Sequence, residues 1–144
     1  MATGQRVDPY RGFNFVVEID GITQAGFQEV SGLDSSTDVT EYREGTDPNH
    51  VRKLSGLNKY SAITLKRGIT DSDELWKWRA KVIDGKIDRR NGSIILLDDA
   101  GQEKLRWNFF NAWPSKWTGP AFNATSTAVA VETLEITHES VEKA

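Results

Sequence analysis

Residues 105–120 read Leu105-Arg-Trp-Asn-Phe-Phe-Asn-Ala-Trp-Pro-Ser-Lys-Trp-Thr-Gly-Pro120, and residues 121–138 continue Ala121-Phe-Asn-Ala-Thr-Ser-Thr-Ala-Val-Ala-Val-Glu-Thr-Leu-Glu-Ile-Thr-His138. This stretch predicts a strand, a kink at Trp113-Pro114, a turn at Gly119-Pro120 and a second strand over residues 125–138. Three of the five tryptophans of the chain lie here, and no catalytic group stands beside them. Such a pattern is typical of a protein that serves as a wall or a surface.

The predicted final strand changes phase partway along. Val129 and Val131 share one parity, whereas Leu134 and Ile136 share the other. Because successive side chains of a strand point to opposite faces, we expect either a β-bulge near Glu132 or a strand that is covered first on one face and then on the other.

Composition limits the function classes that fit. The chain has 144 residues and a formal net charge of −3, which gives no electrostatic reason to expect sequence-specific nucleic acid binding. It has no cysteine, so neither a disulfide framework nor a thiolate metal site can form. Residues 1–7 carry no signal peptide and no window is long enough to span a bilayer, so we expect synthesis and assembly in the cytoplasm.

Alternation of apolar and polar residues dominates the rest of the chain. The clearest strand covers residues 13–19 and stops at the turn dipeptide Asp20-Gly21. Further strands are predicted over residues 26–33, 37–44, 60–66, 93–97 and 104–112. We therefore expect one domain over residues 1–144 with a flexible N-terminus at 1–8. Its fold should be mainly β, a small barrel or sandwich of seven to eight strands with one packed α-helix.

The helix is predicted over residues 71–84. Asp71 as N-cap, with Glu74 three residues later, approximates a capping box, and Gly85 is placed to end the helix. The residues spaced to form its apolar face are Leu75, Trp78 and Val82.

Residues 45–59 are polar and glycine-rich, with Asp47-Pro48-Asn49 as a turn signal. They predict an extended loop. A connection of this length without regular structure usually has a function or becomes ordered by a partner.

No catalytic constellation is found. His50 and His138 are the only histidines, and neither has a second histidine at a metal-ligand spacing. Asp98 and Asp99 precede Ala-Gly and fit a hairpin turn better than a carboxylate pair. We therefore expect no enzyme activity, no catalytic residue, no cofactor and no metal site.

Several short motifs follow one another between about Pro9 and Glu139. They are Gly12-Phe-Asn-Phe-Val-Val-Glu-Ile-Asp-Gly21, Phe27-Gln-Glu-Val-Ser-Gly-Leu33, Tyr42-Arg-Glu-Gly45, Lys53-Leu-Ser-Gly-Leu57, Ile63-Thr-Leu-Lys-Arg-Gly68, Leu75-Trp-Lys-Trp78, Asn111-Ala-Trp-Pro114 and Glu132-Thr-Leu-Glu-Ile-Thr-His138. In their order and spacing they resemble the tail tube proteins of contractile-tailed phages, and most closely the inner-tube subunits of extracellular, phage-tail-like contractile injection systems. The haemolysin-coregulated protein of type VI secretion is similar in fold but further away in sequence.

The resemblance implies a structural role. Six copies would associate through their sheets into a ring, and rings would stack into a rigid hollow tube that conducts cargo and that sheath contraction drives through a target envelope. The implied partners are further copies of the chain, the sheath protein, a baseplate hub or initiator, a cap that ends the tube, and a cargo or length-determining protein in the lumen. The finished particle can be released outside the cell.

The same resemblance implies that the loop at 45–59 reaches an adjacent subunit or ring. Near the proline kink, two tryptophans either close the end of the sandwich or pack into a neighbouring subunit. The expected interface residues are Asp47, His50, Arg52 and Lys53 in the loop, and Trp113 and Trp117 at the kink.

Two alternatives stay open. One is a baseplate tube-initiator paralogue with the same fold, which would start the tube rather than form its bulk. The other is a monomeric β-barrel module that holds a small ligand or glycan between Trp113, Trp117 and the neighbouring loop.

Overall fold

The computed structural model describes residues 11–12, 14–22 and 26–144, so the N-terminus predicted to be flexible at 1–8 lies outside the described residues. These residues form nine strands and one helix. They are β1 (Phe15–Ile19), β2 (Glu29–Ser31), β3 (Ser35–Tyr42), β4 (Arg52–Tyr60), β5 (Ile63–Gly68), α1 (Glu74–Ile83), β6 (Arg90–Leu97), β7 (Glu103–Thr118), β8 (Val131–Thr137) and β9 (Ser140–Lys143). The predicted class, mainly β with one packed helix, is confirmed.

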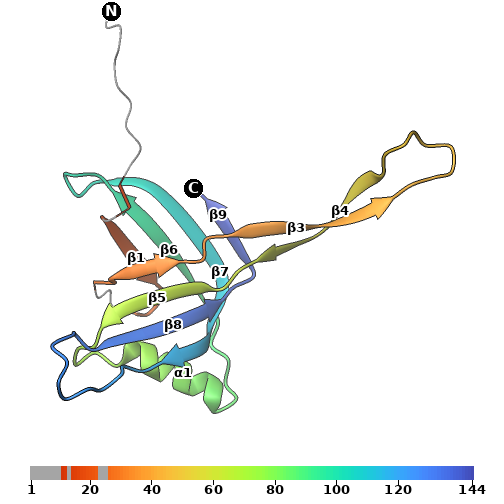
Figure 1. Ribbon diagram of the computed structural model, residues 1–144. Helices are drawn as coiled ribbons and strands as arrows, with labels where there is room; N and C mark the ends of the chain where they lie inside the picture. Colours follow the sequence, from red (N-terminus) through yellow and green to blue (C-terminus); the bar gives the residue numbers. More distant parts are fainter. Residues whose placement is uncertain (1–10, 13, 23–25) are drawn as a thin grey trace, which may run out of the picture.

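The main sheet folds over into an open barrel (Figure 1). Its strand order is β1-β6-β7-β8-β5-β2, and β9 pairs with β7. β1 and β2 lie at the two ends of this order and are not paired with each other among the described residues. β1 is also bridged to the residues that follow it, through Ile19 and Ile22, whereas β2 has no second strand partner among the described residues, so its outer edge is a template for another strand.

β7 joins the two halves of the sheet. Its first part pairs with β6 and β9, and its second part, from Trp113 to Thr118, pairs with β8. Between the two parts Asn111 has a φ of 56°, a left-handed conformation that few non-glycine residues adopt. The predicted kink lies beside this bend, but the strand continues through it. Pro114 has no N–H to donate, and the pairing register with β8 shifts between Pro114 and Lys116.

The core lies between the folded sheet and α1. Strands from both halves of the sheet contribute apolar side chains, and α1 adds Leu75 and Trp78. The Trp78 indole N–H donates to the Asp88 carbonyl at 2.7 Å, so the largest core side chain is also hydrogen-bonded. The other buried apolar residues of this core are Val17, Ile19, Ile63, Leu65, Ile94, Phe109, Ala112, Leu134 and Ile136.

α1 is shorter than the predicted 71–84. Its N-cap is Asp73 and makes no side-chain capping bond, so the capping box predicted for Asp71 does not form. Gly85 follows the helix with a φ of 81°, and its N–H donates to the Val82 carbonyl at 3.0 Å. The expected glycine stop is therefore present.

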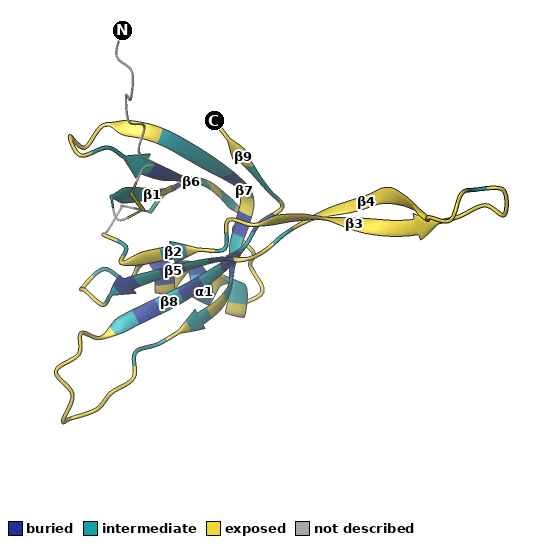
Figure 2. Ribbon diagram, turned by 45° about the horizontal axis from the view of Figure 1, so that its top comes forward, coloured by how far each residue is buried: buried dark blue, intermediate teal, exposed yellow. Residues whose placement is uncertain are grey.

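β3 and β4 form a separate two-stranded arm that projects from the barrel (Figure 1). Every residue of β3 is exposed, as is nearly all of β4 (Figure 2). The extended loop predicted over 45–59 is therefore wrong for residues 52–59, which are strand. A ribbon exposed on both faces does not need alternating apolar residues, so its sequence looks like that of a loop.

The arm continues the β2–β5 pair. At its root Gly32 has a φ of 97°, and a Cβ there would lie 2.2 Å from the Ala62 carbonyl oxygen. This close approach requires glycine.

β8 runs without the bulge predicted near Glu132. Its register with β5 is continuous from Gly68↔Val131 to Ile63↔Ile136. Val129 precedes the strand and is exposed, which explains the apparent change of phase. Glu132 belongs to the buried face, where it faces an arginine instead of an apolar neighbour.

Arg67 and Glu132 form an ion pair inside the barrel. Arg67 is 1% exposed, and its Nε donates to Glu132 Oε1 at 2.6 Å. The Trp117 indole N–H donates to the other carboxylate oxygen at 3.2 Å, and the Arg67 guanidinium also donates to the Ser72 carbonyl. The Phe27 ring lies 5.9 Å from the guanidinium carbon. The network ties β5 to β8, to the end of β7 and to the segment before α1.

Breaking this pair should destabilise the fold. Arg67→Ala leaves the Glu132 carboxylate buried without its cation, so we expect the free energy of unfolding to fall by about 3–5 kcal/mol. Urea denaturation followed by tryptophan fluorescence measures it. Lys59→Ala, which removes the exposed Lys59–Asp38 pair at 3.2 Å, should cost less than about 1 kcal/mol. Arg67→Met combined with Glu132→Leu should recover part of the loss, because it removes both buried charges together. Equal losses of stability for Arg67→Ala and Lys59→Ala would contradict a stabilising role of the buried pair.

Candidate subunit interface

The structure places the six expected interface residues in two groups. Asp47 and His50 lie in the turn between β3 and β4, and Arg52 and Lys53 begin β4. The two tryptophans lie on β7 in the barrel. A single chain therefore does not bring all six together: four lie at the tip of the arm and two lie in the barrel.

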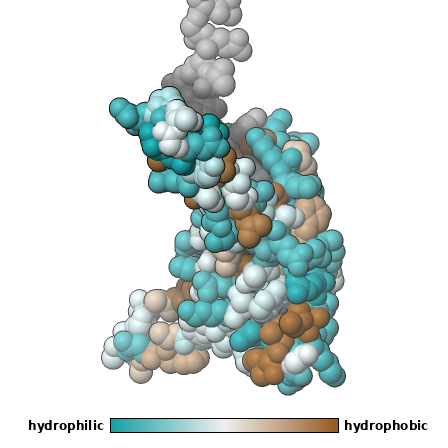
Figure 3. All heavy atoms as spheres, turned by 90° about the vertical axis from the view of Figure 1, so that its right-hand side faces the viewer, coloured by the Kyte–Doolittle hydropathy of each residue, from teal (hydrophilic) through white to brown (hydrophobic). Residues whose placement is uncertain are grey.

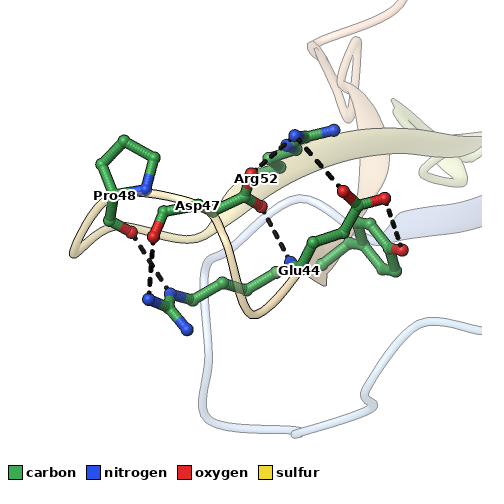
Figure 4. Close-up of polar contacts among 6 residues, drawn as sticks. Glu44, Asp47, Pro48 and Arg52 are labelled. Carbon is green, nitrogen blue, oxygen red and sulfur yellow. Dashed lines mark hydrogen bonds and ion pairs between the residues drawn. The ribbon is translucent and has the colours of Figure 1, made fainter.

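The arm tip is organised around Asp47 (Figure 4). Its Oδ2 accepts the Glu44 backbone N–H at 2.8 Å, and its Oδ1 accepts from the Arg52 guanidinium at 2.6 Å. The Asp47 N–H donates in turn to the Glu44 carbonyl at 3.0 Å. Although the tip is surrounded by solvent, the Asp47 side chain is only 8% exposed. Within one chain, Asp47 therefore holds the turn in shape.

Further contacts fasten the turn from the β3 side. The Arg43 guanidinium donates to the Pro48 carbonyl at 3.2 Å and to the Asp47 carbonyl at 3.0 Å. The Tyr42 hydroxyl donates to Glu44 Oε1 at 3.1 Å. A turn that is already ordered pays less conformational entropy when it binds a partner.

The surface of the tip is open and presents basic side chains beside acidic ones. His50 and Lys53 are exposed, and Lys53 stands opposite Glu41 in the strand register. Half of the Arg52 side chain also remains exposed, at 51%. A shallow depression at the tip is lined by Arg43, Asn49, His50, Val51 and Lys53.

Apolar side chains lie exposed along both strands of the arm. Leu57 is 74% exposed, Val39 62% and Leu54 49%. Figure 3, viewed from the side on which the arm projects, shows hydrophobic patches that interrupt a hydrophilic surface. An isolated two-stranded ribbon is marginally stable in water, so this combination favours a partner. The sequence did carry a signal for this surface, because Val51, Leu54 and Leu57 are apolar residues within a segment that was predicted to be a polar loop.

The two tryptophans of β7 are integrated into the barrel. The Trp117 ring packs edge-on against the Trp76 ring of α1, with centroids 4.8 Å apart. Trp113 stands opposite Thr137 of β8 and is half-buried. Trp76 itself is 42% exposed, so this aromatic pair reaches the surface through the helix.

Groups considered for chemistry have structural contacts. The His138 ring is buried, and its Nε2 lies 2.9 Å from the Ser61 carbonyl oxygen. His50, the other histidine, is exposed in the turn of the arm. Asp98 accepts the backbone N–H of Gln102, which lowers the pKa of the carboxyl, and also that of Ala100. The turn interpretation of Asp98 is therefore confirmed. In the part of the chain that the structure describes, no cluster of three or more His, Cys, Asp or Glu residues is arranged to hold a metal ion.

The helical content gives no membrane span. Across residues 11–12, 14–22 and 26–144, no helix has both the length and the apolar character needed to cross a bilayer.

The chain is similar to one family of known proteins and to several solved structures. The sequence pattern of the T4-like virus tail tube protein gp19 family matches residues 11–142. A chain in the cryo-EM structure of the PVC sheath–tube complex, an extracellular contractile injection system in its extended state, is 32% identical. That match covers 94% of this chain and 91% of the other, with a TM-score of 0.85. None of the curated protein sequences matches this chain.

Two further structures extend the comparison. A chain in the tube-terminating cap of the anti-feeding prophage is 29% identical, with coverage of 100% and 99% and a TM-score of 0.88. Hcp1 from Flavobacterium johnsoniae is 19% identical over 91% of this chain and 94% of its own, with a TM-score of 0.60, which shows a shared fold.

The role of Asp47 can be measured on the isolated chain. Asp47→Ala removes the acceptor of the Glu44 N–H, so we expect this amide to exchange with solvent at least tenfold faster by NMR. The urea midpoint of the barrel should stay the same because the arm packs on itself. Asp38→Ala, which breaks only the exposed pair with Lys59, is the matched control. Unchanged Glu44 protection in Asp47→Ala would show that the carboxylate does not hold the turn.

Proposed function

The chain belongs to the T4-like virus tail tube protein gp19 family, and we propose that it builds the inner tube of a contractile, phage-tail-like injection system. The observation that carries this proposal is the match over residues 11–142 to a family of tube proteins. Similarity over more than nine-tenths of both chains to a component of a sheath–tube complex supports it. The role is that of a structural subunit rather than an enzyme.

In the proposed assembly, copies of the chain close into a six-membered ring and rings stack into a hollow tube. The anti-feeding prophage baseplate, whose chain shares this fold, was reconstructed with six-fold symmetry. The outer edge of β2 suits such a ring, because a neighbouring copy can pair with backbone groups that have no strand partner among the described residues of one copy. The sheath, baseplate and cap proteins are the proposed partners at the outer surface and at the two ends, with cargo in the lumen.

The arm is the proposed contact between copies. It places His50, Arg52 and Lys53 at its outermost end, beyond the barrel of its own chain (Figure 1). Asp47 contributes by fixing the turn that carries them. The exposed apolar side chains along the ribbon give the same contact a hydrophobic component. Trp113 and Trp117 then act from within the barrel, by supporting the surface of β7 and α1.

Electron microscopy tests the proposal. Concentrated purified protein should show hollow tubes or six-fold rings in negative stain, with matching masses. Deleting residues 46–49, or Lys53→Glu, should prevent assembly and leave a folded monomer, because the first removes the turn and the second places two acidic side chains opposite each other. Lys86→Glu, at an exposed position after α1, should assemble normally. Strictly monomeric parent protein would contradict the proposed self-assembly, whereas normal tubes from the tip variants would contradict the role of the arm.

A further inference from the structure

The loop between β7 and β8 presents an aromatic side chain to solvent. Phe122 is 88% exposed, the largest value among the exposed large hydrophobic residues of the described chain, and Val129 in the same loop is 76% exposed. Residues 117–131 contain no charged side chain. The loop therefore combines an apolar anchor with a segment that can leave water without desolvating an ion.

The loop is ordered by its own hydrogen bonds. Asn123 Oδ1 accepts from the backbone N–H of Thr125 at 3.0 Å and from its hydroxyl at 2.8 Å. The Ser126 N–H donates to the Asn123 carbonyl at 3.0 Å. At the far end of the loop, Ile69 N–H donates to the Ala130 carbonyl at 2.9 Å. Phe122 thus precedes a formed turn, and docking it costs little conformational entropy.

An apolar cavity of matching size lies between β1 and β2, the two strands at the ends of the sheet order. Its volume is about 220 Å³. This is below the range of roughly 300–1,000 Å³ for pockets that take drug-sized ligands. Apolar cavities of about 150 Å³ already take up a benzene ring. Its lining comes from β1, β2, β6, β7 and the adjoining segments, namely Gly12, Phe15, Gln28, Glu29, Val30, Leu33, Ile94, Leu96 and Trp107.

Charge favours the loop as the occupant of this cavity. Among the described residues of the lining the single charged side chain is Glu29, which is already paired with Lys66 at 3.6 Å. An uncharged segment can enter without leaving a buried charge unpaired. Most other exposed apolar residues stand directly beside charged ones, such as Leu54 beside Lys53 and Ile83 beside Asp84, whereas Leu57 and Ile69 do not.

We propose that Phe122 of one copy inserts into this cavity of a second copy. The inference rests on the proposed function and specifies one contact within that assembly. The anchor and the cavity lie on different parts of the chain, so the contact is heterologous, the type that generates rings and stacked filaments. Large aromatic side chains in fitted pockets are the usual anchors of such interfaces.

Disulfide trapping tests the contact directly, because the chain has no native cysteine. Leu33 lines the cavity and is 39% exposed, so it serves as the rim position. A cysteine at position 122 is shorter than phenylalanine, so it reaches only the rim of the cavity and not its interior. A disulfide to position 33 forms only if the two Cα atoms come within about 4.4–6.8 Å of each other. The double variant F122C/L33C, assembled and then oxidised, should give a ladder of covalent multimers on a non-reducing gel. F122C/I87C, with its second cysteine at a 52% exposed position after α1, should not.

A second measurement uses no cross-link. Phe122→Ala should raise the protein concentration needed for assembly by about tenfold, while the urea midpoint of the monomer stays the same because the side chain is 88% exposed in the single chain. Phe122→Trp should assemble much nearer to the parent concentration.

The outcomes separate the two proposals. A ladder in F122C/L33C alone, together with weaker assembly of Phe122→Ala, supports the contact. Tubes that form without a ladder, or with equal ladders in both double variants, overturn the contact and leave the proposed function standing. An unchanged assembly concentration for Phe122→Ala also overturns it. If the parent stays monomeric at every concentration, the proposed function fails and this contact between copies fails with it.

Discussion

The bend in β7 is the constraint on which the rest of the structure depends. One strand pairs with β6 and β9 before the bend and with β8 after it, so it sets the angle between the two halves of the barrel. Asn111 holds the bend in a left-handed conformation, its N–H donating to Asn91 Oδ1 at 3.0 Å and its side-chain amide to Glu139 Oε2 at 3.0 Å. Ala112, next to it, is fully buried, where a small side chain permits the close approach. Without this bend Phe109 and the apolar side chains of β8 would not share one core.

The bend also explains why a charged pair lies inside the barrel. Folding the sheet over brings the second half of β7 beside β8, where Trp117 can reach the carboxylate of Glu132. That carboxylate neutralises Arg67, and the outer face of Trp117 packs on α1 through Trp76. The contacts run from the centre of the barrel to the exposed side of the helix. The features that a neighbouring copy can cover lie elsewhere, in the outer edge of β2, the exposed arm and Phe122. These features are those expected of a subunit whose fold is completed by its neighbours.

Much of the barrel could be predicted from the sequence. Wherever one face of a strand is buried, as in 63–68, the alternation of apolar and polar residues is visible, and the hairpin of β6 and β7 has an unmistakable turn at Asp98. The arm was missed because both of its faces are exposed. Neither explanation offered for the phase change near Glu132, a bulge or a switch of the covered face, is correct: Val129 lies outside β8, and the buried ion pair makes the core position of Glu132 look like a surface one. Asparagine tolerates the left-handed conformation, but the bend at Asn111 could not be located from the sequence, because the acceptors of its hydrogen bonds, Asn91 and Glu139, are distant in sequence.

The central claim is that the arm becomes covered when copies of the chain assemble. Hydrogen–deuterium exchange, measured by mass spectrometry on the monomer and on assembled particles, tests it most directly. The account predicts that peptides from residues 35–60, exposed in the single chain, exchange at least tenfold more slowly in the particle. Peptides from β8, already buried, should change little on assembly. Equal exchange of the arm in monomer and particle would contradict the account.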